Sequence, residues 1–473
     1  MKDNSQDGSS EPVLASYTCP GELYSIPREI HLARLAAYYS KCRDCEHRFD
    51  SDRVYFKRDE PKSVSERPAT RTTLVSEEGV RGVYLNELDR NRALLWGEAI
   101  AALLWEEQPM MAMGKPPEEE QVFLAVSAVG SRPAAFQSPT VVVGFDERPS
   151  SPDIVTGVVL GLRRMGCSVI DLGQTMLPTL AFHVFSKDAN GGLFVTGAGC
   201  NPSWTGFDIL KKGAGPISLS GLQQIEQFVK NGVGRQTRQI GAHRPYQGQA
   251  EYEASLESGF HALRPLKIVC GTSTRMLPRA LDRLFAKLPC DLIQLALPTR
   301  QRNLFDPRDV DLVRVATKVV EGQFHLGLII DDDGRHSAFI TDKGRLVTPR
   351  EIARLLIEVA LREHHAGQFI LSTCWLAEAR KWLEGREAIA IDGGEAASEI
   401  VARLTEREAL MALSADGRVW YRQTFAACDA LLVLAGILQA LSLSDAPFSD
   451  VVSRIPSANT GVTSDTPSRD GTA

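Results

Sequence analysis

The sequence predicts an α/β protein made of three successive α/β/α domains, each built on a mixed and mostly parallel β-sheet. The chain has 473 residues, which is enough for about three domains of ordinary size. Apolar residues make up 43% and charged residues 24% of the chain, a balance typical of soluble globular proteins. Between residues 72 and 456, short apolar runs alternate with stretches of helical periodicity, which favours right-handed crossovers between parallel strands.

The charge and the apolar runs argue against two classes of partner. A net charge of -6 disfavours a dedicated nucleic-acid surface or an anionic membrane partner. No apolar run approaches the roughly 20 residues of a membrane span. The first residues are polar and lack the apolar core of a signal peptide. We therefore expect a cytoplasmic protein that binds neither nucleic acid nor membranes.

Residues 1–71 are expected to form an N-terminal extension. Residues 1–18 are rich in Ser, Asp and Gly and are expected to be disordered, and residues 50–71 read as a charged linker or arm. Between them, residues 27–40 have apolar side chains at helical spacing, which predicts one amphipathic helix.

The extension also contains a Cys-x-x-Cys pair, Cys42 and Cys45, with Cys19, His31 and His47 nearby in sequence. Thiolates and imidazole suit Zn²⁺, so a small zinc site is one interpretation. The spacing lacks a complete second pair, and a surface turn with two free thiols explains the residues equally well. Five further cysteines lie in apolar surroundings and are expected in the core: Cys167, Cys270, Cys290, Cys374 and Cys428.

The first domain is predicted over residues 72–230. It contains a short strand and a helix before residue 107, then strand, helix and strand over 139–173, then helix and strand up to Val195. The stretch from Val195 to Asp208, VTGAGCNPSWTGFD, follows that last strand and is expected to precede a helix. Gly197 and Gly199 allow a sharp turn and a close backbone approach to a ligand. Backbone amides at a helix start would suit an anion, although an ordinary Gly-rich turn is the plain alternative.

The second domain is predicted over residues 256–346. Leu326 to Ile330 form an apolar strand, and Asp331, Asp332 and Asp333 follow at its carboxyl end. Clustered carboxylates suit Mg²⁺, a hard cation, but a turn would favour the same residues. Adjacent residues of a strand point to opposite faces, so Asp332 is not expected to join the other two.

The third domain is predicted over residues 347–456. Two strand–helix units are followed by a hairpin with Asp416 and Gly417 at its turn, and then by a long apolar helix. Residues 457–473 are polar, with no core-forming side chains, and are expected to form a disordered tail.

With these motifs in place, the chain from about residue 72 to 456 resembles the α-D-phosphohexomutases (phosphoglucomutase/phosphomannomutase). In that family a Thr-Ala-Ser-His-Asn-Pro loop carries a phosphoserine, and Asn-Gly-Phe-Lys follows. Here Gly199 stands at the phosphoserine position, Cys200 at the His position and Asp208 at the Lys position. The matching residues are Ala198, Asn201, Pro202, Gly206 and Phe207.

The resemblance implies phosphate contacts and a metal loop. Arg81 lies in a turn similar to the family's Gly-Ile-Arg-Gly, and Arg148 in one similar to Gly-Arg-Asp-x-Arg, so both are implied as phosphate contacts together with Asn201. The family's Asp-Gly-Asp-Ala-Asp-Arg loop holds Mg²⁺. Asp331 and Asp333 match its first two aspartates, but Arg335 replaces the third and His336 its arginine. A cation at a ligand position predicts weakened Mg²⁺ binding.

Two later family motifs are less well preserved. Of the Glu-x-Ser-Gly-His loop that selects the sugar, only Gly417 remains, with Asp416 and Arg418 beside it as candidate contacts to hydroxyls and phosphate. The Ser-Gly-Thr loop of the family's fourth domain has no counterpart in this sequence. An apolar face is then expected where that domain would dock, which favours a protein partner or a homodimer.

Family members transfer a phosphoryl group through the phosphoserine, which this sequence lacks. The first hypothesis is therefore a mutase-like protein that is catalytically inactive or strongly impaired and retains phosphosugar or phosphate binding. An active, diverged mutase with a substituted nucleophile such as Cys200 is the alternative, since a cysteine of lowered pKa is a good nucleophile. A structural remnant without a ligand is the third hypothesis.

Overall fold

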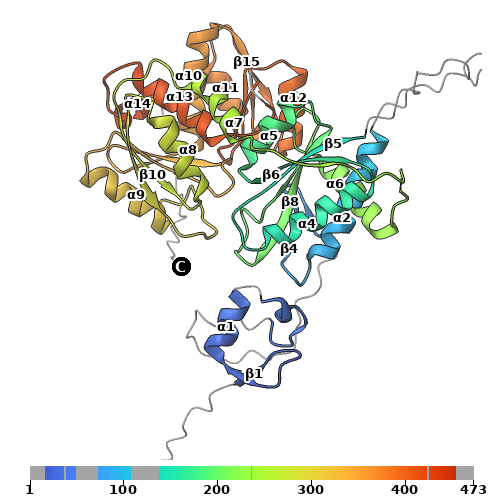
Figure 1. Ribbon diagram of the computed structural model, residues 1–473. Helices are drawn as coiled ribbons and strands as arrows, with labels where there is room; N and C mark the ends of the chain where they lie inside the picture. Colours follow the sequence, from blue (N-terminus) through green and yellow to red (C-terminus); the bar gives the residue numbers. More distant parts are fainter. Residues whose placement is uncertain are drawn as a thin grey trace, which may run out of the picture. The chain divides into compact units, whose positions relative to one another are not determined.

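A computed structural model gives the fold, and the residues that it describes form four β-sheets in succession along the chain (Figure 1). The described residues are 16–36, 39–48, 73–107, 138–235, 237–422 and 425–453. Of the residues 1–18 that were expected to be disordered, residues 16–18 form a short strand, so the expectation is wrong there. The expectations for residues 1–15, for the linker at 50–71 and for the tail at 457–473 lie outside the described residues. The chain divides into two compact units: the first comprises residues 1–175, 186–213 and 217–246, and the second comprises residues 176–185, 214–216 and 247–473.

A small module precedes the large sheets. Two antiparallel strands, β1 (Ser16–Thr18) and β2 (Ser25–Pro27), lead into α1 (Arg28–Ala36), and a 3₁₀ turn, η1 (Ser40–Asp44), follows. The helix predicted within residues 27–40 is therefore confirmed.

The first unit contains a seven-stranded mixed sheet. β5, β6, β7 and β9 are parallel, whereas β8 runs antiparallel to β7 and β4. In spatial order the strands are β3 (Val75–Ser76), β4 (Gly79–Val83), β8 (Trp204–Lys211), β7 (Gly191–Val195), β5 (Thr140–Phe145), β6 (Ser168–Gln174) and β9 (His243–Pro245). The associated helices are α2 (Arg90–Glu106), α4 (Ser151–Arg164) and α6 (Leu219–Asn231). The order strand, helix, strand predicted for residues 139–173 is confirmed.

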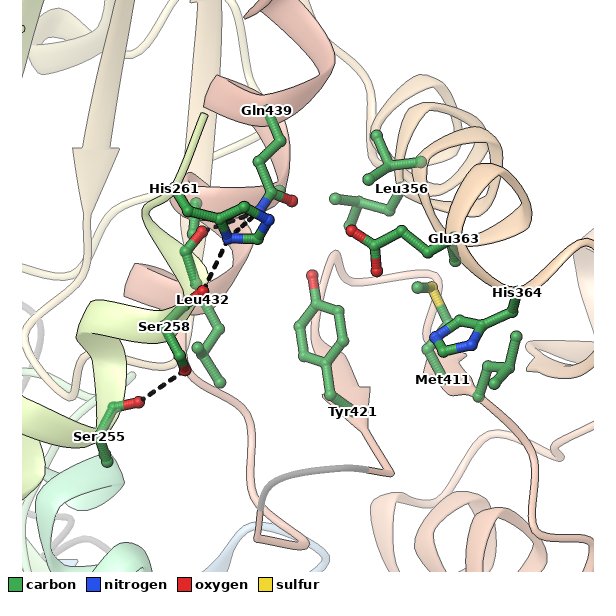
Figure 2. Close-up of a pocket in the computed structure, with 16 residues that line it drawn as sticks. Ser255, Ser258, His261, Leu356, Glu363, His364, Met411, Tyr421, Leu432 and Gln439 are labelled. Carbon is green, nitrogen blue, oxygen red and sulfur yellow. Dashed lines mark hydrogen bonds between the residues drawn. The ribbon is translucent and has the colours of Figure 1, made fainter. Parts of the chain in front are cut away.

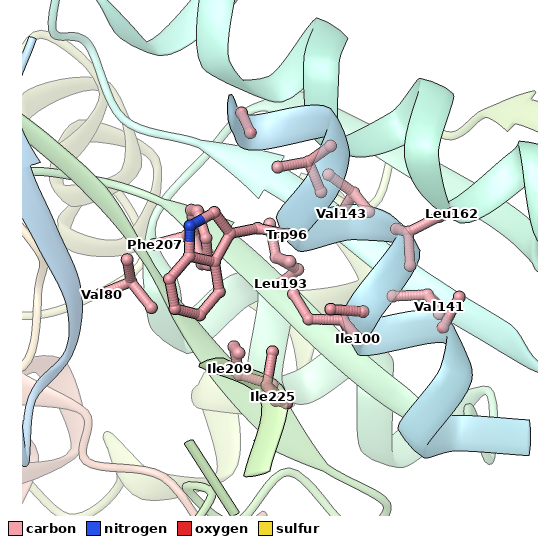
Figure 3. Close-up of a cluster of buried hydrophobic side chains, with 14 of the residues drawn as sticks. Val80, Trp96, Ile100, Val141, Val143, Leu162, Leu193, Phe207, Ile209 and Ile225 are labelled. Carbon is pink, nitrogen blue, oxygen red and sulfur yellow. The ribbon is translucent and has the colours of Figure 1, made fainter. Parts of the chain in front are cut away.

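The core of this sheet is formed where α2 packs on the strands. Trp96 of α2 is 3% exposed and meets Phe207 of β8 edge to face, with ring centroids 5.7 Å apart. Figure 3 shows Trp96 and Ile100 of α2 among side chains of β4, β5, β7 and β8. Burying aromatic rings of this size contributes strongly to stability, because it removes a large apolar area from water.

The segment after the loop at residues 196–203 differs from the prediction. A strand, β8, follows the loop, and the expected helix is absent from this place. Six of the eight residues of β8 are buried, because the strand lies inside the sheet between β7 and β4. A short, mostly buried segment of this kind shows no clear period in its sequence. As a strand it hydrogen-bonds to a neighbouring strand on each side, which is more favourable than forming one or two isolated helical turns. The loop therefore joins two antiparallel strands, and the proposed anion site at a helix start is wrong.

The second unit contains two sheets. The five-stranded sheet has the order β11 (Asp291–Ala296), β10 (Lys267–Thr272), β12 (Leu326–Ile330), β13 (Ser337–Thr341) and β14 (Leu346–Val347). The four-stranded sheet has the order β16 (Ala388–Asp392), β15 (Gly367–Leu371), β17 (Met411–Leu413) and β18 (Val419–Tyr421). The strand at residues 326–330 and the hairpin around residue 417 were both predicted and are confirmed.

Helices accompany both of these sheets. α5 (Leu177–Ser186), α7 (Gln249–Leu256) and the 3₁₀ turn η3 (Glu257–Gly259) belong to this unit. The later ones are α8 (Met276–Phe285), α9 (Val310–Glu321), α10 (Pro349–His364), η4 (Thr373–Trp375), α11 (Leu376–Trp382), α12 (Ala397–Glu406), α13 (Ala430–Ser442) and α14 (Phe448–Ser453). In the described part of the chain, no helix is both long and apolar enough to cross a bilayer.

A prediction concerns the crossing of α2 and α4, where glycines let the two backbones approach closely. A methyl group added at Gly161 of α4 would overlap the carbonyl oxygen of Leu94 of α2. Alanine ordinarily favours a helix over glycine. Here Gly161→Ala is expected to lower the free energy of unfolding by roughly 1–3 kcal/mol, because the helices must move apart. Denaturant unfolding measures this.

The matched control is Thr156→Ala, at an exposed position of the same helix. It is expected to change the free energy of unfolding by less than about 0.5 kcal/mol. Equal stability of the Gly161→Ala variant and the unaltered protein would contradict the close approach of α2 and α4.

Candidate functional site

Two of the predicted loops begin at one edge of the seven-stranded sheet. β5 and β7 are parallel neighbours whose last residues, Phe145 and Val195, are paired. The chain continues from them into Asp146 and into the loop at 196–203. Ligands of open α/β sheets bind beyond the carboxyl ends of such strands, which makes this edge the candidate site of the first unit.

Asp146 holds the two loops together. Its carboxylate accepts hydrogen bonds from the Ser151 hydroxyl at 2.5 Å and from the Thr196 hydroxyl at 2.8 Å. The backbone N–H of Gly197 donates to it at 3.3 Å. Asp146 is 6% exposed, and a buried carboxylate requires such donors. The shape of the site is therefore fixed by hydrogen bonds within the chain.

Arg148 and Asn201, the two predicted phosphate contacts of these loops, also take part in this framework. Arg148 donates from Nη1 to the Asn201 carbonyl at 3.2 Å, and its Nε lies 3.4 Å from Asp146 Oδ2. The Asn201 side-chain oxygen accepts from the backbone N–H and the hydroxyl of Ser203, each at 3.0 Å. The structure thus brings both residues to the loops, where they support the turn.

Gly199 occupies the tip of the loop at the position that the resemblance assigns to the phosphoserine. Its φ is +75°, the left-handed region that favours glycine, and a methyl group built on it meets no atom within 4 Å. Cys200 follows, partly exposed, and its N–H closes the turn on the Gly197 carbonyl at 3.1 Å. The loop has room at its tip but no side chain there.

Arg81 lies in a buried ion pair with Asp208. Arg81 Nη2 is 2.5 Å from Asp208 Oδ1, and each residue is 5% exposed. The two residues sit on the paired strands β4 and β8. The sequence identified Arg81 but missed Asp208 as its partner. The signal was available, because a carboxylate stands where the resemblance calls for a lysine.

The acidic turn of the second unit joins β12 to β13. The N–H of Asp331 donates to the His336 carbonyl at 3.0 Å and closes the turn. Asp331, Asp333 and His336 each offer one ligand atom, and these atoms lie within 4.8 Å of one another. The sequence predicted the two aspartates but did not assign His336 to the group.

Arginines neutralise this turn. Arg335 Nε is 2.6 Å from Asp333 Oδ2. Arg302, whose side chain is 1% exposed, places Nη1 3.6 Å from Asp331 and 3.5 Å from Asp332. The argument that adjacent aspartates point to opposite faces was wrong, because Asp331 and Asp332 lie in a turn rather than in a strand and face the same guanidinium.

The pKa values of the acidic turn reflect this crowding. Burial and the neighbouring Asp333 and Asp332 carboxylates raise the pKa of Asp331 to about 6. Burial disfavours charge on His336, but hydrogen bonds with Asp333 and Asp416 outweigh it and raise the pKa of His336 to about 9. His336 is therefore protonated at neutral pH in the metal-free chain, and a metal ion would have to displace that proton.

The hairpin turn with Asp416 and Arg418 lies against the acidic turn. Arg418 Nε is 2.7 Å from Asp416 Oδ2, and His336 Nε2 is 3.8 Å from the same oxygen. Burial opposes ionisation of Asp416, but His336 and Arg418 hold its pKa well below the usual range. The structure thus brings together the predicted residues Asp333, Asp416 and Arg418.

Comparisons with known proteins bear on this frame. The model of the family described as "Phosphoglucomutase/phosphomannomutase, alpha/beta/alpha domain I" matches residues 111–235. A phosphomannomutase/phosphoglucomutase of Pseudomonas aeruginosa is 24% identical over 339 residues, covering 70% of this chain and 72% of the relative. A phosphoglucomutase of Neisseria meningitidis is 23% identical over 355 residues, covering 73% of this chain and 75% of the relative. Over these lengths the chain is similar to phosphoglucomutases and phosphomannomutases, and its residues 111–235 match domain I of that family.

Solved structures of family members share the fold. A family protein of Burkholderia thailandensis superposes with a TM-score of 0.67 at 21% identity, covering 81% of each chain. A putative phosphomannomutase of Thermus thermophilus gives a TM-score of 0.63 at 17% identity, covering 81% of this chain and 83% of the other. The mixed-sheet α/β fold predicted from the sequence is therefore confirmed.

The residues of the acidic turn fit the Mg²⁺ of the mutase family poorly. Mg²⁺ prefers an octahedron of anionic or carbonyl oxygens. Of the three side chains that converge here, Asp333 is engaged by Arg335, and His336 carries a proton. The positive charges of Arg335 and protonated His336 oppose the binding of a cation such as Mg²⁺. The aspartates of this turn are therefore paired with arginine rather than free for a metal.

A separate cavity of about 230 Å³ lies in the second unit, away from the predicted site residues (Figure 2). α10 and α13, the segment at 255–261 and the strands β17 and β18 line it. Figure 2 shows Tyr421 pointing between Glu363 and the pair His261 and Gln439. Burial raises the pKa of Tyr421, so its phenol is neutral at ordinary pH. None of the predicted loop residues lines this cavity.

A prediction follows for Arg335. Arg335→Asp restores a third carboxylate to the turn and removes the cation that engages Asp333. The variant is expected to gain Mg²⁺ affinity, because the ligand set becomes anionic oxygen. Its melting temperature should rise when millimolar MgCl₂ is added, whereas that of the unaltered chain should not, since a ligand stabilises only the state that binds it.

Arg308→Asp is the control, because the Arg308 side chain is 88% exposed and lies outside the turn. The melting temperature of this variant, like that of the unaltered chain, should not rise when MgCl₂ is added. A magnesium-dependent rise in the melting temperature of the unaltered chain would show that the arginines do not displace the metal.

Proposed function

We propose that this mutase-like protein binds a phosphosugar or phosphate in carbohydrate metabolism and carries out phosphoryl transfer at a strongly reduced rate or not at all. The observation that carries the proposal is Gly199. Its backbone has the left-handed conformation, and the space beside it is open. The family's reaction needs a nucleophilic oxygen at this place, and a glycine has none to offer.

The charges around the loops support the same proposal. Phosphoryl transfer depends on cations aimed at the oxygens of the transferring group. Arg81, the cation implied for this task, is already neutralised by Asp208 at 2.5 Å. In the acidic turn, Arg335 and Arg302 likewise neutralise Asp333 and Asp331. Arg81 and the aspartates of the acidic turn are thus each paired with an oppositely charged side chain of the chain itself.

Binding without transfer requires less of the site than catalysis does. The frame of the loops is intact, because Asp146 ties residues 148–151 to residues 196–197 by hydrogen bonds within the chain. Arg148 and Arg418 remain in the predicted loops, each with a carboxylate beside it. Arginine can bind phosphate and a carboxylate at the same time, because its guanidinium presents five donors.

An active, diverged mutase is the second candidate, and Cys200 is the observation that favours it. Its thiol is partly exposed and belongs to the residue directly after Gly199. A thiolate could accept a phosphoryl group in place of the serine. The geometry of the loop must then shift by one residue, which is why we rank this candidate second.

One experiment separates the two candidates. The full chain is incubated with Mg²⁺ and a hexose 1,6-bisphosphate, and its intact mass is measured. Isomerisation of glucose 1-phosphate and mannose 1-phosphate is followed in the same samples. We expect no mass increase of a phosphoryl group and no turnover above that of heat-treated protein, because no nucleophile stands at residue 199.

Binding is measured in parallel by the melting temperature with each hexose phosphate, and with the unphosphorylated hexose as the control. A rise that requires the phosphate supports the proposal, because only a ligand of the folded state stabilises it. Turnover that is lost in Cys200→Ala would establish the second candidate instead. Absence of both turnover and stabilisation would indicate a chain without a sugar-phosphate ligand.

A further inference from the structure

The N-terminal module, residues 16–48, gathers four side chains that bind zinc in other proteins. They are Cys19, His31, Cys42 and Cys45, and their exposed fractions are 3%, 1%, 4% and 5%. A surface turn with free thiols, the alternative considered for Cys42 and Cys45, is therefore wrong. All three cysteines of the module are buried, and none is in a disulfide.

Local structure brings each of the four residues to the interior. Cys19 directly follows β1 and starts a turn, in which the Glu22 N–H donates to the Cys19 carbonyl at 3.0 Å. His31 lies in the first turns of α1, just after β2. Cys42 lies in η1, and the Cys45 N–H donates to its carbonyl at 3.3 Å. Burial raises the pKa of the Cys42 thiol, and so do the Cys19 and Cys45 thiols, which are its neighbours.

The described residues of the module bury almost no apolar side chains. Among its described side chains, the one buried residue besides these four is Ile26. Segments below about 40 residues usually need a metal, disulfides or oligomerisation to stay folded, since they bury too little apolar surface. One disulfide could join only two of the three buried cysteines and would leave the third as a buried thiol.

A second layer of contacts orients the ligand side chains. Arg34 of α1 donates from Nη1 to Cys19 Sγ at 3.0 Å and to Glu22 at 2.8 Å. A donor held beside a ligand sulfur in this way is the kind of outer contact that fixes the orientation of metal ligands. Tyr17 stacks on the His31 ring with centroids 4.1 Å apart and planes 6° apart, which fixes the orientation of the imidazole.

We propose that Cys19, His31, Cys42 and Cys45 bind one structural Zn²⁺ ion through three thiolates and one imidazole. This ligand set is a common one for structural zinc, which is tetrahedral and uses all four positions. His47 is the competing imidazole, but its side chain is 39% exposed and lies edge-on to Tyr17 at 5.1 Å. The site holds the module together, and it is independent of the sugar-phosphate site proposed above.

Zinc is measured by mass spectrometry on the full chain, produced in zinc-supplemented medium and purified without chelators. About one zinc per chain is expected, the stoichiometry of a single closed site. Cys42→Ser and Cys45→Ser should each lose it. Cys374 was expected in the core, but it is exposed, so that expectation is wrong. Cys374→Ser, which removes this exposed thiol of the second unit, should keep the zinc and serves as the control.

Two histidine variants test the ligand set beyond mere folding. His31→Cys should retain zinc, because a fourth thiolate completes the tetrahedron, whereas His31→Ala should lose most of it. His47→Ala should retain zinc. Replacement of zinc by Co²⁺ should give the strong visible bands of a tetrahedral ion with thiolate ligands.

Several results would overturn the proposal. Zinc below about 0.2 per chain after supplementation would show that no closed site exists. Full zinc content in Cys42→Ser or Cys45→Ser would place the metal elsewhere. Loss of zinc in His47→Ala together with its retention in His31→Ala would refute the ligand set as stated.

Discussion

The buried ion pair between Arg81 and Asp208 is the interaction on which the account of the site depends. A charge removed from water must be paired, and here the partner of the arginine belongs to the chain itself. The second unit also pairs its charges within the chain, because Arg335 and Arg302 neutralise the aspartates of the turn at 331–333. Each half of the mutase frame thus carries internal counter-ions at places where the family resemblance implies a phosphoryl group or a metal.

This pairing supports the proposal that the fold persists while phosphoryl transfer is slowed or lost. In a working phosphoryl-transfer site, several like charges are held together and are balanced only by substrate or metal. Here Asp208, at the position of the family's lysine, pairs with Arg81, and Arg335, at the position of an aspartate, pairs with Asp333. Asp146 meanwhile keeps its hydrogen bonds to both loops of the first unit. On the function that we propose, these internal ion pairs allow ligand binding but not rapid phosphoryl transfer.

The sequence predicted most strands and helices because their apolar periods are local. β12 at residues 326–330 and the β5–α4–β6 order are examples. It failed at β8, whose short buried run has no distinguishing period. It also missed the partners Asp208 and Arg302, because each ion pair joins segments far apart in sequence. Only the sheet and the loops bring them together. The cysteines of the N-terminal module were noticed, but their burial depends on the turns between them.

The most direct measurement is a double-mutant cycle on Arg81 and Asp208, using Arg81→Met, Asp208→Leu and the variant with both changes. The free energies of unfolding give the coupling between the two side chains. We expect a coupling of about 2–3 kcal/mol, with the double variant more stable than either single one, because each single change strands a buried charge. A coupling below about 0.5 kcal/mol would contradict the account, because Arg81 would then be available to a phosphate.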